Sequence, residues 1–535
     1  MDWKSLGKIL ERSFKEHWER PALSNYGDDP VSYGELASRI KRLHNLFEDN
    51  GLRVGDRVAL CSHNQANWAV CFLATLTYGA VPVLILHEFK PENIHNLVCH
   101  SEARIFFVED SILEKLSADQ MPGVSLLVRM DSLEDMFAGA TAGFCPEDVR
   151  YHEDKPDELA MINYTSGTSG FSKGVMIPYR SVIFNLRFSR EVAEPQMNSS
   201  SKVIAMLPSA HMYGMMFEFF YEIMIGAHVM FLTRVPSPRI IMSAFADVHP
   251  DLVVAVPLIV EKLYKSRLKE VADSTRFLRS IPLVGLAVKN KIRKELVGVF
   301  GGRFEEVIIG GAPFNSEVEA FLRDIRFPFT VGYGMTECGP IITYSKWKKT
   351  RKGSCGRAVP GCRIRIDSPD PAHIAGEIQV SGDNVFLGYY KNPEATADAF
   401  TSDGWFRTGD IGVMGKDGYL YLRGRSKCMI LGPSGQNIYP EELEAVINNV
   451  SFVSESLVVE EDGALTALVY PDYALAEKEG LDRDALKEQL TLSLPLINKS
   501  LPSYSQIRRM ELMQEDFERT PKHSIKRYLY QKDRI

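Results

Sequence analysis

The sequence predicts an α/β fold in which a large N-terminal domain, residues 1–426, precedes a small α+β C-terminal domain, residues 427–535. Three observations lead to this prediction. At 535 residues the chain is too long for a single hydrophobic core. Helical patterns alternate with short apolar runs in two long stretches, which is typical of parallel α/β layers. The pattern then changes twice, near residue 353 and again near Lys427.

The N-terminal domain is predicted to contain two layered α/β sheet subdomains. In residues 31–108 a helical pattern, SYGELASRIKRLHNLFEDNG, is followed by the buried-strand runs RVALCSHN and ARIFFVED. In residues 203–310 four apolar runs, KVIAMLP, AHVMFL, LVVAVP and EVIIGG, each predict a buried strand that ends in a loop. The Met- and Phe-rich segment 217–232 between them contains charged residues and is expected to pack inside the protein.

The two later parts of the chain have different patterns. Between residues 353 and 425 the alternating segments RIRID, GEIQVSG and GYLYLRGR are separated by glycine turns, which predicts antiparallel strands in a small distorted β-barrel. After Lys427 the sequence predicts a helix at YPEELEAVINNV, strands at SESLVVEED and ALTALVYPD, and a charged helix near 481–497.

Composition excludes several classes of protein. A net charge of −7 and a pI near 6.0 give no general attraction to nucleic acid. The N-terminal segment predicts an amphipathic helix with Leu6, Ile9, Leu10 and Phe14 on one side, not a signal peptide. No run approaches the roughly 18 apolar residues of a transmembrane helix, so only peripheral membrane contact is compatible with the sequence. Eight cysteines without a CxxC pair predict a cytoplasmic protein with free thiols and no zinc site.

The strongest local signal is the segment YTSGTSGFSKG, residues 164–174. Its glycines allow backbone N–H groups to turn toward an anion, its hydroxyl groups add short donors, and Lys173 adds positive charge. The segment follows LAMINY, a buried-strand pattern, as expected of a phosphate-binding loop. The Walker pattern G-x-x-x-x-G-K-[ST] does not fit it in any register. A plain Ser/Gly linker is the competing interpretation, which Lys173 and the apolar residues after it disfavour.

Five further motifs follow in order: LPSAHMYG (207–214), GGAP (310–313), GYGMTE (332–337), GWFRTGD (404–410) and GYLYLRGRSKCMILGPSGQNIYPEELE (418–444). Together with the loop they resemble the signature of the adenylate-forming, or AMP-binding, superfamily. The likeness runs from about residue 20 to 530 and is greatest to long- or medium-chain fatty acyl-CoA synthetases. The resemblance implies a small C-terminal domain that is mobile, pivoting at Lys427.

The resemblance also implies roles in binding ATP and Mg²⁺. Tyr333 would stack on adenine, Thr336 would hydrogen-bond the α-phosphate, and Glu337 would bind the metal, since a hard divalent cation takes carboxylate and phosphate oxygens. Asp410 would accept both ribose hydroxyls and Arg425 would reach ribose and phosphate. The remaining implied cofactor contacts are Thr165, Ser166, Gly167, Thr168, Ser169, Gly170 and Lys173 at the phosphates, and Gly311, Ala312, Pro313 and Gly334 beside the adenine.

The implied chemistry has two steps. A carboxylate attacks the α-phosphorus of ATP to give acyl-AMP and pyrophosphate, and a thiol, that of coenzyme A, then displaces AMP. Gly432 and Gly435 would face the site during thioester formation and allow close approach of the pantetheine arm. His211 would shape the site or gate the acyl tunnel and not act as a general base, because a carboxylate is already ionised at neutral pH. A structural histidine is the alternative.

The substrate is less well defined. The segment MYGMMFEFFYEIMIG predicts either an adaptable apolar pocket or a core helix. No charged residue stands out as a partner for the ammonium group of an amino acid. A fatty acid is the first choice of substrate, and an aryl acid is the second. An acyl carrier protein is the alternative acceptor, and the sequence leaves chain length and oligomeric state open.

The segment RTPKHSIKR, residues 519–527, departs from the family pattern P-x-T-x-x-G-K-I-x-R. Aligned on Ile525 and Arg527, Ser524 takes the position of the lysine that in the family stabilises negative charge during acyl-AMP formation. Lys522 and Lys526 flank it, and on an extended segment both would point to the same side as residue 524. Three hypotheses follow: Lys522 takes over the role, Lys526 does, or the role is lost and the chain is a non-catalytic adenylate-binding homologue.

Overall fold

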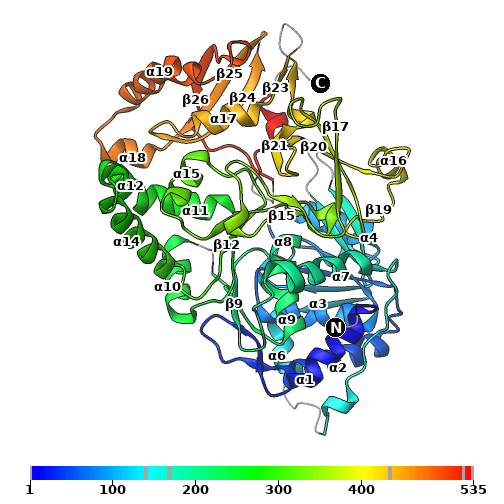
Figure 1. Ribbon diagram of the computed structural model, residues 1–535. Coiled ribbons are helices and arrows are strands. Elements are labelled where there is room, and N and C mark those ends of the chain that lie inside the picture. The colour runs from blue at the N-terminus through cyan, green and yellow to red at the C-terminus, as the bar shows by residue number, and fades with distance from the viewer. Residues whose placement is uncertain are drawn as a thin grey trace.

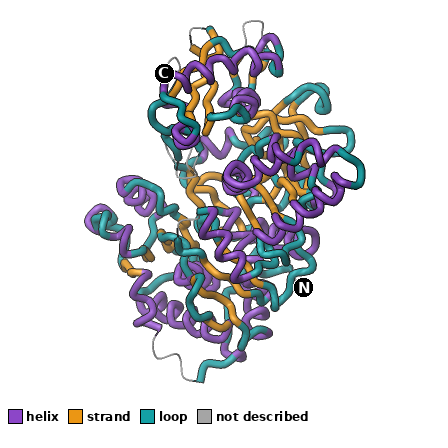
Figure 2. Tube along the Cα trace, turned by 90° about the vertical axis from the view of Figure 1, so that its left-hand side faces the viewer, coloured by secondary structure: helices purple, strands orange, loops and turns teal. Residues whose placement is uncertain are grey.

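The computed structural model describes residues 3–137, 143–165, 172–234, 237–431, 436–461, 463–520 and 524–531. The first half of the chain, blue to green in Figure 1, forms the lower and middle parts of the molecule. The last hundred residues, orange to red, gather at the top, and Figure 2 shows them at the same end after a quarter turn. The predicted order, a large N-terminal part followed by a small C-terminal part, is therefore confirmed.

The first sheet has seven strands in the order β19-β8-β7-β4-β3-β5-β6. From β7 to β6 all neighbouring strands are parallel, whereas β8 and β19 add an antiparallel edge. Helix α3 is buried on nearly every side, because its residues are apolar all round. The bounds are β3 Arg57–Cys61, β4 Val81–Leu84, β5 Ile105–Val108, β6 Leu126–Arg129, β7 Leu159–Thr165, β8 Lys173–Pro178 and β19 Gly388–Tyr389, with α2 Tyr33–Asp49, α3 Ala66–Tyr78, α4 Pro91–Ser101, α5 Asp110–Leu113, α6 Leu133–Phe137 and α7 Tyr179–Phe188.

The second layer consists of two smaller sheets, β2-β1-β10-β9 and β11-β12-β13, which an isolated parallel bridge between Val203 and Leu252 joins. All four strands predicted between residues 203 and 310 are present and pair in parallel. The N-terminal helix α1 is also confirmed, with its four predicted apolar residues buried. The bounds are α1 Leu6–Glu16, β1 Pro21–Asn25, β2 Val31–Ser32, β9 Lys202–Ala205, β10 His228–Phe231, α10 Pro238–Val248, β11 Val253–Ala255, α11 Pro257–Leu263, α12 Lys269–Ser274, α13 Arg276–Ser280, α14 Val284–Val299, β12 Val307–Ile309, α15 Ser316–Asp324 and β13 Phe329–Val331.

The antiparallel strands form two sheets, β14-β15-β16 and β17-β18-β20-β21. An isolated bridge between Arg357 and Tyr419 connects them. This confirms the antiparallel unit predicted from alternating residues and glycine turns. The bounds are β14 Tyr333–Gly334, β15 Ile341–Tyr344, β16 Arg357–Ala358, β17 Arg363–Asp367, β18 Gly376–Ser381, α16 Pro393–Asp398, β20 Phe406–Met414 and β21 Leu420–Arg425.

The C-terminal part combines a small hairpin with a three-stranded sheet, β24-β25-β26, covered by helices. The helix and strands predicted after Lys427 are all present. Among the described residues, no helix is both long and apolar enough to cross a membrane. The bounds are β22 Ile430–Leu431, β23 Asn437–Ile438, α17 Pro440–Ile447, β24 Val453–Glu461, β25 Ala464–Pro471, α18 Tyr473–Lys478, α19 Arg483–Lys499 and β26 Arg509–Leu512.

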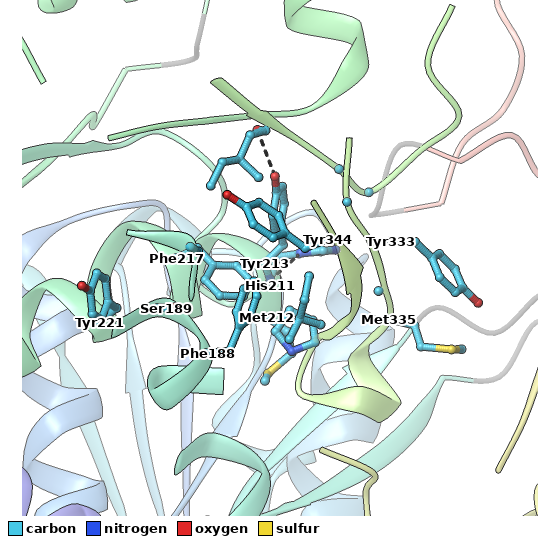
Figure 3. Close-up of a pocket in the computed structure, with 18 of the residues that line it drawn as sticks. Phe188, Ser189, His211, Met212, Tyr213, Phe217, Tyr221, Tyr333, Met335 and Tyr344 are labelled. Atoms are coloured by element: carbon cyan, nitrogen blue, oxygen red, sulfur yellow. Dashed lines mark hydrogen bonds between the residues drawn. The ribbon is translucent and has the colours of Figure 1, made fainter. Parts of the chain in front are cut away.

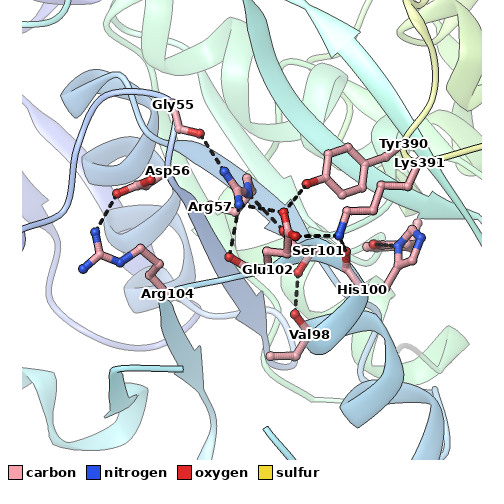
Figure 4. Close-up of polar contacts among 11 residues, drawn as sticks. Gly55, Asp56, Arg57, Val98, His100, Ser101, Glu102, Arg104, Tyr390 and Lys391 are labelled. Carbon is pink, nitrogen blue, oxygen red and sulfur yellow. Dashed lines mark hydrogen bonds and ion pairs between the residues drawn. The ribbon is translucent and has the colours of Figure 1, made fainter. Parts of the chain in front are cut away.

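A polar cluster at the antiparallel edge of the first sheet fixes β19 in place (Figure 4). The Glu102 carboxylate accepts hydrogen bonds from Arg57 and from the Tyr390 hydroxyl, both at 3.0 Å, and forms an ion pair with Lys391 at 2.8 Å. These contacts join the end of α4 to the residues that follow β19. Because Tyr389 belongs to β19 and Lys173 begins the neighbouring strand β8, the cluster sets the position of two side chains that reach the candidate site.

Candidate functional site

A largely apolar cavity lies where β12 and β13 end, beneath a helical segment and beside β14 and β15 (Figure 3). Its position follows the rule that open α/β sheets bind ligands beyond the carboxyl ends of their strands. The lining residues are Phe188, Ser189, Ala193, Glu194, His211, Met212, Tyr213, Phe217, Tyr221, Leu252, Ile308, Gly310, Gly311, Gly332, Tyr333, Gly334, Met335, Thr336, Pro340, Ile341 and Tyr344.

The helical segment supplies one wall of this cavity. It consists of α8, Met212–Met215, a π-helical stretch, Met216–Phe220, and α9, Tyr221–Ile225. Tyr213, Phe217 and Tyr221 recur every four residues and line the cavity, whereas Phe219 and Phe220 face the buried core. One face of this Met- and Phe-rich segment therefore lines a cavity, and the other face packs in the core, as the two interpretations of the segment expected.

Backbone without side chains forms the opposite wall. A Cβ atom at Gly310 would lie 3.1 Å from the Tyr213 ring, whose hydroxyl donates to the Ile308 carbonyl at 3.1 Å. A Cβ atom at Gly334 would lie only 2.3 Å from the Pro340 carbonyl oxygen. Glycine at these positions therefore allows the residue after β12 to approach Tyr213 and β14 to approach Pro340 closely.

A hydrogen-bonded group of three predicted residues adjoins this end of the cavity. The Tyr333 hydroxyl donates to Asp410 Oδ2 at 2.7 Å, and Arg425 Nε lies 3.7 Å from Asp410 Oδ1. Burial raises the pKa of Asp410, and the Arg425 charge and the Tyr333 hydroxyl partly offset this because they stabilise the carboxylate. The β20–β21 pairing sets Asp410 directly opposite Arg425, so the backbone itself brings acceptor and cation together.

A second group links the phosphate loop to the predicted metal ligand. Glu337 is buried, and its Oε1 accepts a hydrogen bond from the Tyr389 hydroxyl at 3.0 Å. The ammonium group of Lys173 lies 4.5 Å from the centre of the Tyr389 ring, which places a cation close to the carboxylate. Thr165 and Lys173 are register partners at the loop end of the β7–β8 hairpin, so both ends of the predicted loop are held together.

The described residues contain no group of three or more His, Cys, Asp or Glu side chains that could hold a metal ion. Glu337 offers one carboxylate. This donor set fits Mg²⁺ only if nucleotide phosphates and water complete the coordination shell, which is the usual way that Mg²⁺ binds in nucleotide sites.

His211 is positioned by its backbone role. It is the N-terminal cap of α8, and its Nδ1 accepts a hydrogen bond from the Tyr213 N–H at 3.3 Å. It also lines the cavity. A ring that caps a helix in this way has a fixed orientation, which supports a shaping role and gives no sign of a general base.

Glu194 is the residue that sequence reasoning missed. It lines the cavity near Tyr221. It lies in AEPQ, which carries no motif, and only the path of the chain after α7 brings it to the cavity. The prediction that no charged residue serves as a partner for the ammonium group of an amino acid stays a prediction.

Other predicted residues lie outside this arrangement. Ala312 and Pro313 are exposed on the loop after β12 and do not line the cavity, and Lys427 is exposed in a short turn after β21. Lys526 forms an ion pair with Glu518 at 3.1 Å. The predicted residues Ser166, Gly167, Thr168, Ser169, Gly170, Gly432, Gly435 and Lys522 fall outside the described residues.

Comparisons with known proteins agree with this geometry. The family model described as "AMP-binding enzyme" matches residues 10–390, and that of the "AMP-binding enzyme C-terminal domain" matches residues 429–533. The chain is 28% identical over 465 residues to the long-chain-fatty-acid–CoA ligase FadD15 of Mycobacterium bovis, covering 80% of this chain and 75% of the relative. It also resembles two solved structures. ATP-bound MatB from Rhodopseudomonas palustris superposes with a TM-score of 0.78 at 25% sequence identity, and the match covers 98% of both chains. The anthranilate CoA ligase AuaEII in complex with anthranoyl-AMP superposes with a TM-score of 0.81 at 19% sequence identity, and the match covers 99% of this chain and 97% of that chain.

The Tyr333–Asp410 hydrogen bond yields a prediction about protonation. Tyr333→Phe should raise the pKa of Asp410 further, because the ionised carboxylate loses a donor. Since the carboxyl is neutral below its pKa, any ligand that needs the carboxylate should bind more weakly as the pH falls, and in the variant this weakening should begin at a higher pH. Infrared difference spectroscopy of the carboxyl band, assigned with Asp410→Asn, measures the shift. Tyr390→Phe, which removes a remote hydroxyl, is the control, and an unchanged Asp410 titration in Tyr333→Phe would contradict the prediction.

Proposed function

The chain belongs to the family of AMP-binding enzymes and is an AMP-forming acid–CoA ligase, and on that premise we propose that it activates a fatty acid with ATP. The product of the first step is acyl-AMP with release of pyrophosphate. In the second step the acyl group passes to coenzyme A and AMP leaves. The observation that carries this proposal is one cavity that is lined at one end by Tyr333, Gly311 and Thr336 and elsewhere mainly by apolar and aromatic side chains.

In the first step a substrate carboxylate oxygen bonds to the α-phosphorus while the bond from that phosphorus to the bridging oxygen breaks, so pyrophosphate departs. The main work of the protein is to hold both reactants in line. We infer that Tyr333 stacks on adenine against Gly311 and Gly334, and that Asp410 and Arg425 hold the ribose. Thr336 lines the same end of the cavity as Tyr333, where a hydroxyl can donate to the α-phosphate.

Glu337 is the residue that we assign to Mg²⁺. When bound, the ion would neutralise phosphate charge during the displacement. The hydrogen bond from the Tyr389 hydroxyl holds the orientation of the Glu337 carboxylate. Lys173, whose ammonium group lies beside the Tyr389 ring, adds positive charge near that carboxylate. We propose that the glycine- and hydroxyl-rich loop between Thr165 and Lys173 holds the phosphates.

In the second step the thiol of coenzyme A, as thiolate, attacks the acyl carbon, and the bond to the AMP oxygen breaks. We propose that the C-terminal domain, residues 427–535, rotates about Lys427 between the two steps. The hydrophobic clusters support a boundary there, because the large cluster ends at Leu420 and the C-terminal cluster begins at Ile430. Polar side-chain contacts cross the boundary, and the Arg423–Glu442 ion pair at 3.0 Å among them is exposed, so breaking that pair costs little free energy. Gly432 and Gly435 remain proposed contacts of the pantetheine arm.

The wall formed by Phe188, Phe217 and Tyr344 supports an acyl or aryl group as the occupant of the apolar end. A fatty acid remains the first choice because the family resemblance is greatest to fatty acyl-CoA synthetases. An aryl acid is the second choice. Transfer to an acyl carrier protein in place of coenzyme A is the alternative second step.

A panel of carboxylic acids tests the proposed function. Purified protein with ATP and Mg²⁺ should release pyrophosphate with fatty acids of suitable length, and adding coenzyme A should convert the product to acyl-CoA with release of AMP. Continuous pyrophosphate detection and chromatography of the thioester measure the two steps. Asp410→Asn should lower kcat/KM for ATP about tenfold to hundredfold, because a bidentate charged acceptor becomes a weaker one.

The outcomes separate the alternatives. Pyrophosphate release only with aryl acids would replace the fatty acid with the second choice. Pyrophosphate release without consumption of coenzyme A would favour a carrier protein as acceptor. No pyrophosphate with any acid would contradict the proposed enzyme and support a non-catalytic adenylate-binding homologue.

The C-terminal tail yields a second prediction for this reaction. Ser524 is exposed, and Lys526 is engaged with Glu518, so we propose that Lys522 supplies the positive charge in the first step. Lys522→Ala should slow acyl-AMP formation about a hundredfold or more while thioester formation from supplied acyl-AMP stays close to normal. Rapid-quench assays of the two half-reactions measure this.

Lys526→Ala is the matched control for Lys522→Ala, because it removes the other flanking lysine. A larger loss in Lys526→Ala would transfer the role to that residue. Near-normal rates of both half-reactions in both variants would contradict any role for the flanking lysines. If Lys522 supplies the charge, adding Ser524→Lys, which restores the family pattern, to Lys522→Ala should restore acyl-AMP formation.

A further inference from the structure

The far end of the cavity contains a buried carboxyl group with an unused oxygen. Glu194 follows the π-helical turn after α7, lines the cavity and is only 2% exposed. Its Oε2 accepts a hydrogen bond from the Gln196 side chain. Within the described part of the chain, its Oε1 is buried and has no hydrogen-bond partner. Buried polar atoms in native proteins nearly always have partners, so an orphan on a cavity wall indicates a ligand.

The other polar groups at this end of the cavity are already occupied. The Tyr221 hydroxyl donates to the Glu194 carbonyl at 2.8 Å, and the Ser189 hydroxyl donates to the Asn185 carbonyl at 3.1 Å. The Tyr344 hydroxyl donates to Glu306. Among the described residues that line this end of the cavity, Glu194 is therefore the one whose side chain keeps a polar atom, Oε1, without a hydrogen-bond partner. Figure 3 shows Ser189 and Tyr221 at the opposite side of the cavity from Tyr333.

The charged groups around Glu194 do not supply a cation to pair with it. The charge of Lys346 acts on it, but the Lys346 ammonium forms an ion pair with Glu305 at 2.9 Å. Burial raises the pKa of Glu194 well above its usual range, and the negative charges of Glu306 and Glu305 act in the same direction. These effects favour the neutral form of the carboxyl, which can both donate and accept a hydrogen bond.

We propose that Glu194 forms a polar subsite at the distal end of the acyl cavity and selects an acid that carries a hydroxyl group far from its carboxylate. This inference rests on the proposed function and narrows its substrate class from a plain fatty acid to a hydroxylated one. A hydroxyl both donates and accepts, so it matches a neutral carboxyl, whereas a methyl terminus leaves Oε1 desolvated and unpaired.

Other buried glutamates near the cavity show why Glu194 differs. Glu218 accepts hydrogen bonds at Oε2 from the N–H groups of Met206 and Leu207 at 3.1 and 2.9 Å, and its Oε1 is, among the described residues, a buried oxygen without a partner, as is that of Glu194, but Glu218 does not line the cavity. Glu222 is fully buried, and burial raises its pKa to about 8, but it does not line the cavity. Glu222 therefore offers a matched control: a buried carboxyl close in sequence and structure that cannot touch a substrate in this cavity.

Matched pairs of acids test the subsite. Fatty acids of several lengths, among them octanoate and dodecanoate, are each compared with the ω-hydroxy acid of the same length, by pyrophosphate release and by calorimetric binding of the acid alone. The wild-type protein should favour a hydroxylated member by about tenfold or more at the best length, as expected where a site is built to hydrogen-bond a hydroxyl. Glu194→Leu should reverse this preference, Glu194→Gln should keep part of it, and Glu222→Gln should leave it unchanged.

The two readouts separate the two claims. Absence of pyrophosphate with every acid would contradict the proposed function, while the binding ratio would still decide the role of Glu194. The inference is overturned if wild-type protein binds or uses plain acids as well as hydroxylated ones, or if Glu194→Leu leaves the ratio unchanged. A change of ratio in Glu222→Gln equal to that in Glu194→Leu would also overturn it, because the effect would then be structural.

A second, independent observation concerns the surface formed by α12, α13 and the start of α14, at the left edge of Figure 1. We call it the basic–apolar patch. Phe277 and Leu283 are 76% and 84% exposed, and Leu283 has a left-handed backbone, φ 64°, which is rare for a bulky residue and marks a strained, outward-facing turn. The remaining exposed apolar residues of the patch are Val271, Leu278, Val284 and Leu286.

The charge of this segment is opposite to that of the chain. Residues 262–299 contain ten Lys and Arg but three Asp and Glu, a net charge of +7, whereas the whole chain carries −7. Exposed apolar side chains flanked by cations fit an anionic lipid surface, where the apolar groups enter the interface and the cations meet the headgroups. We infer that the basic–apolar patch is a peripheral docking site for anionic membranes.

Vesicle co-sedimentation tests this docking site. The protein should bind vesicles of phosphatidylcholine with phosphatidylglycerol and bind phosphatidylcholine alone much more weakly. Phe277→Ser with Leu283→Ser, or Lys291→Glu with Lys294→Glu, should each weaken binding about tenfold or more. Leu492→Ser with Leu496→Ser removes exposed leucines from α19, 70% and 68% exposed, and should not change binding. Absence of vesicle binding, or a dimer that Phe277→Ser abolishes, would overturn the inference.

Discussion

The hydrogen bond between Tyr333 and Asp410 connects the three parts of the molecule on which the site depends. Tyr333 stands just beyond the carboxyl end of the second parallel layer, and Asp410 lies on β20 of the antiparallel unit. Arg425, the register partner of Asp410, precedes the proposed pivot at Lys427 by two residues. This contact links the second parallel layer, the antiparallel unit and the segment before the proposed pivot. A nucleotide bound there would therefore contact residues whose positions depend on all three parts.

The two ends of the cavity follow one rule about buried polar groups. At the end near Tyr333, each carboxylate has a hydroxyl or a cation as partner, so its burial is compensated. At the far end the hydroxyl groups are bonded to protein acceptors, and Glu194 alone among the described residues there keeps an unused oxygen. If Glu194 acts as inferred, such an end suits a ligand with polar groups at both termini better than a chain that ends in a methyl group.

Sequence reasoning predicted those features that depend on neighbours in the chain. Continuous apolar runs located β9 to β12, because strands covered on both faces have no alternation, and glycine turns located the antiparallel unit. The contacts that sequence reasoning missed join distant segments. Tyr389 reaches Glu337 only because β19 crosses back to pair with β8, and Glu194 reaches the cavity only through the turn after α7. No local pattern encodes such a return of the chain.

The tail also shows how packing limits a substitution. Ile525 packs against the cluster that contains Phe517, Arg527 pairs with the buried Glu444, and residues 519 and 525 form a β-bridge. Burial raises the pKa of Glu444, and Arg527 compensates by stabilising its carboxylate, so this pair costs most if only one partner moves. These contacts favour the present register of Ile525 and Arg527, which keeps Lys526 two residues beyond Ser524. They therefore support the proposal that Lys522, which precedes Ser524 in the sequence and falls outside the described residues, supplies the positive charge.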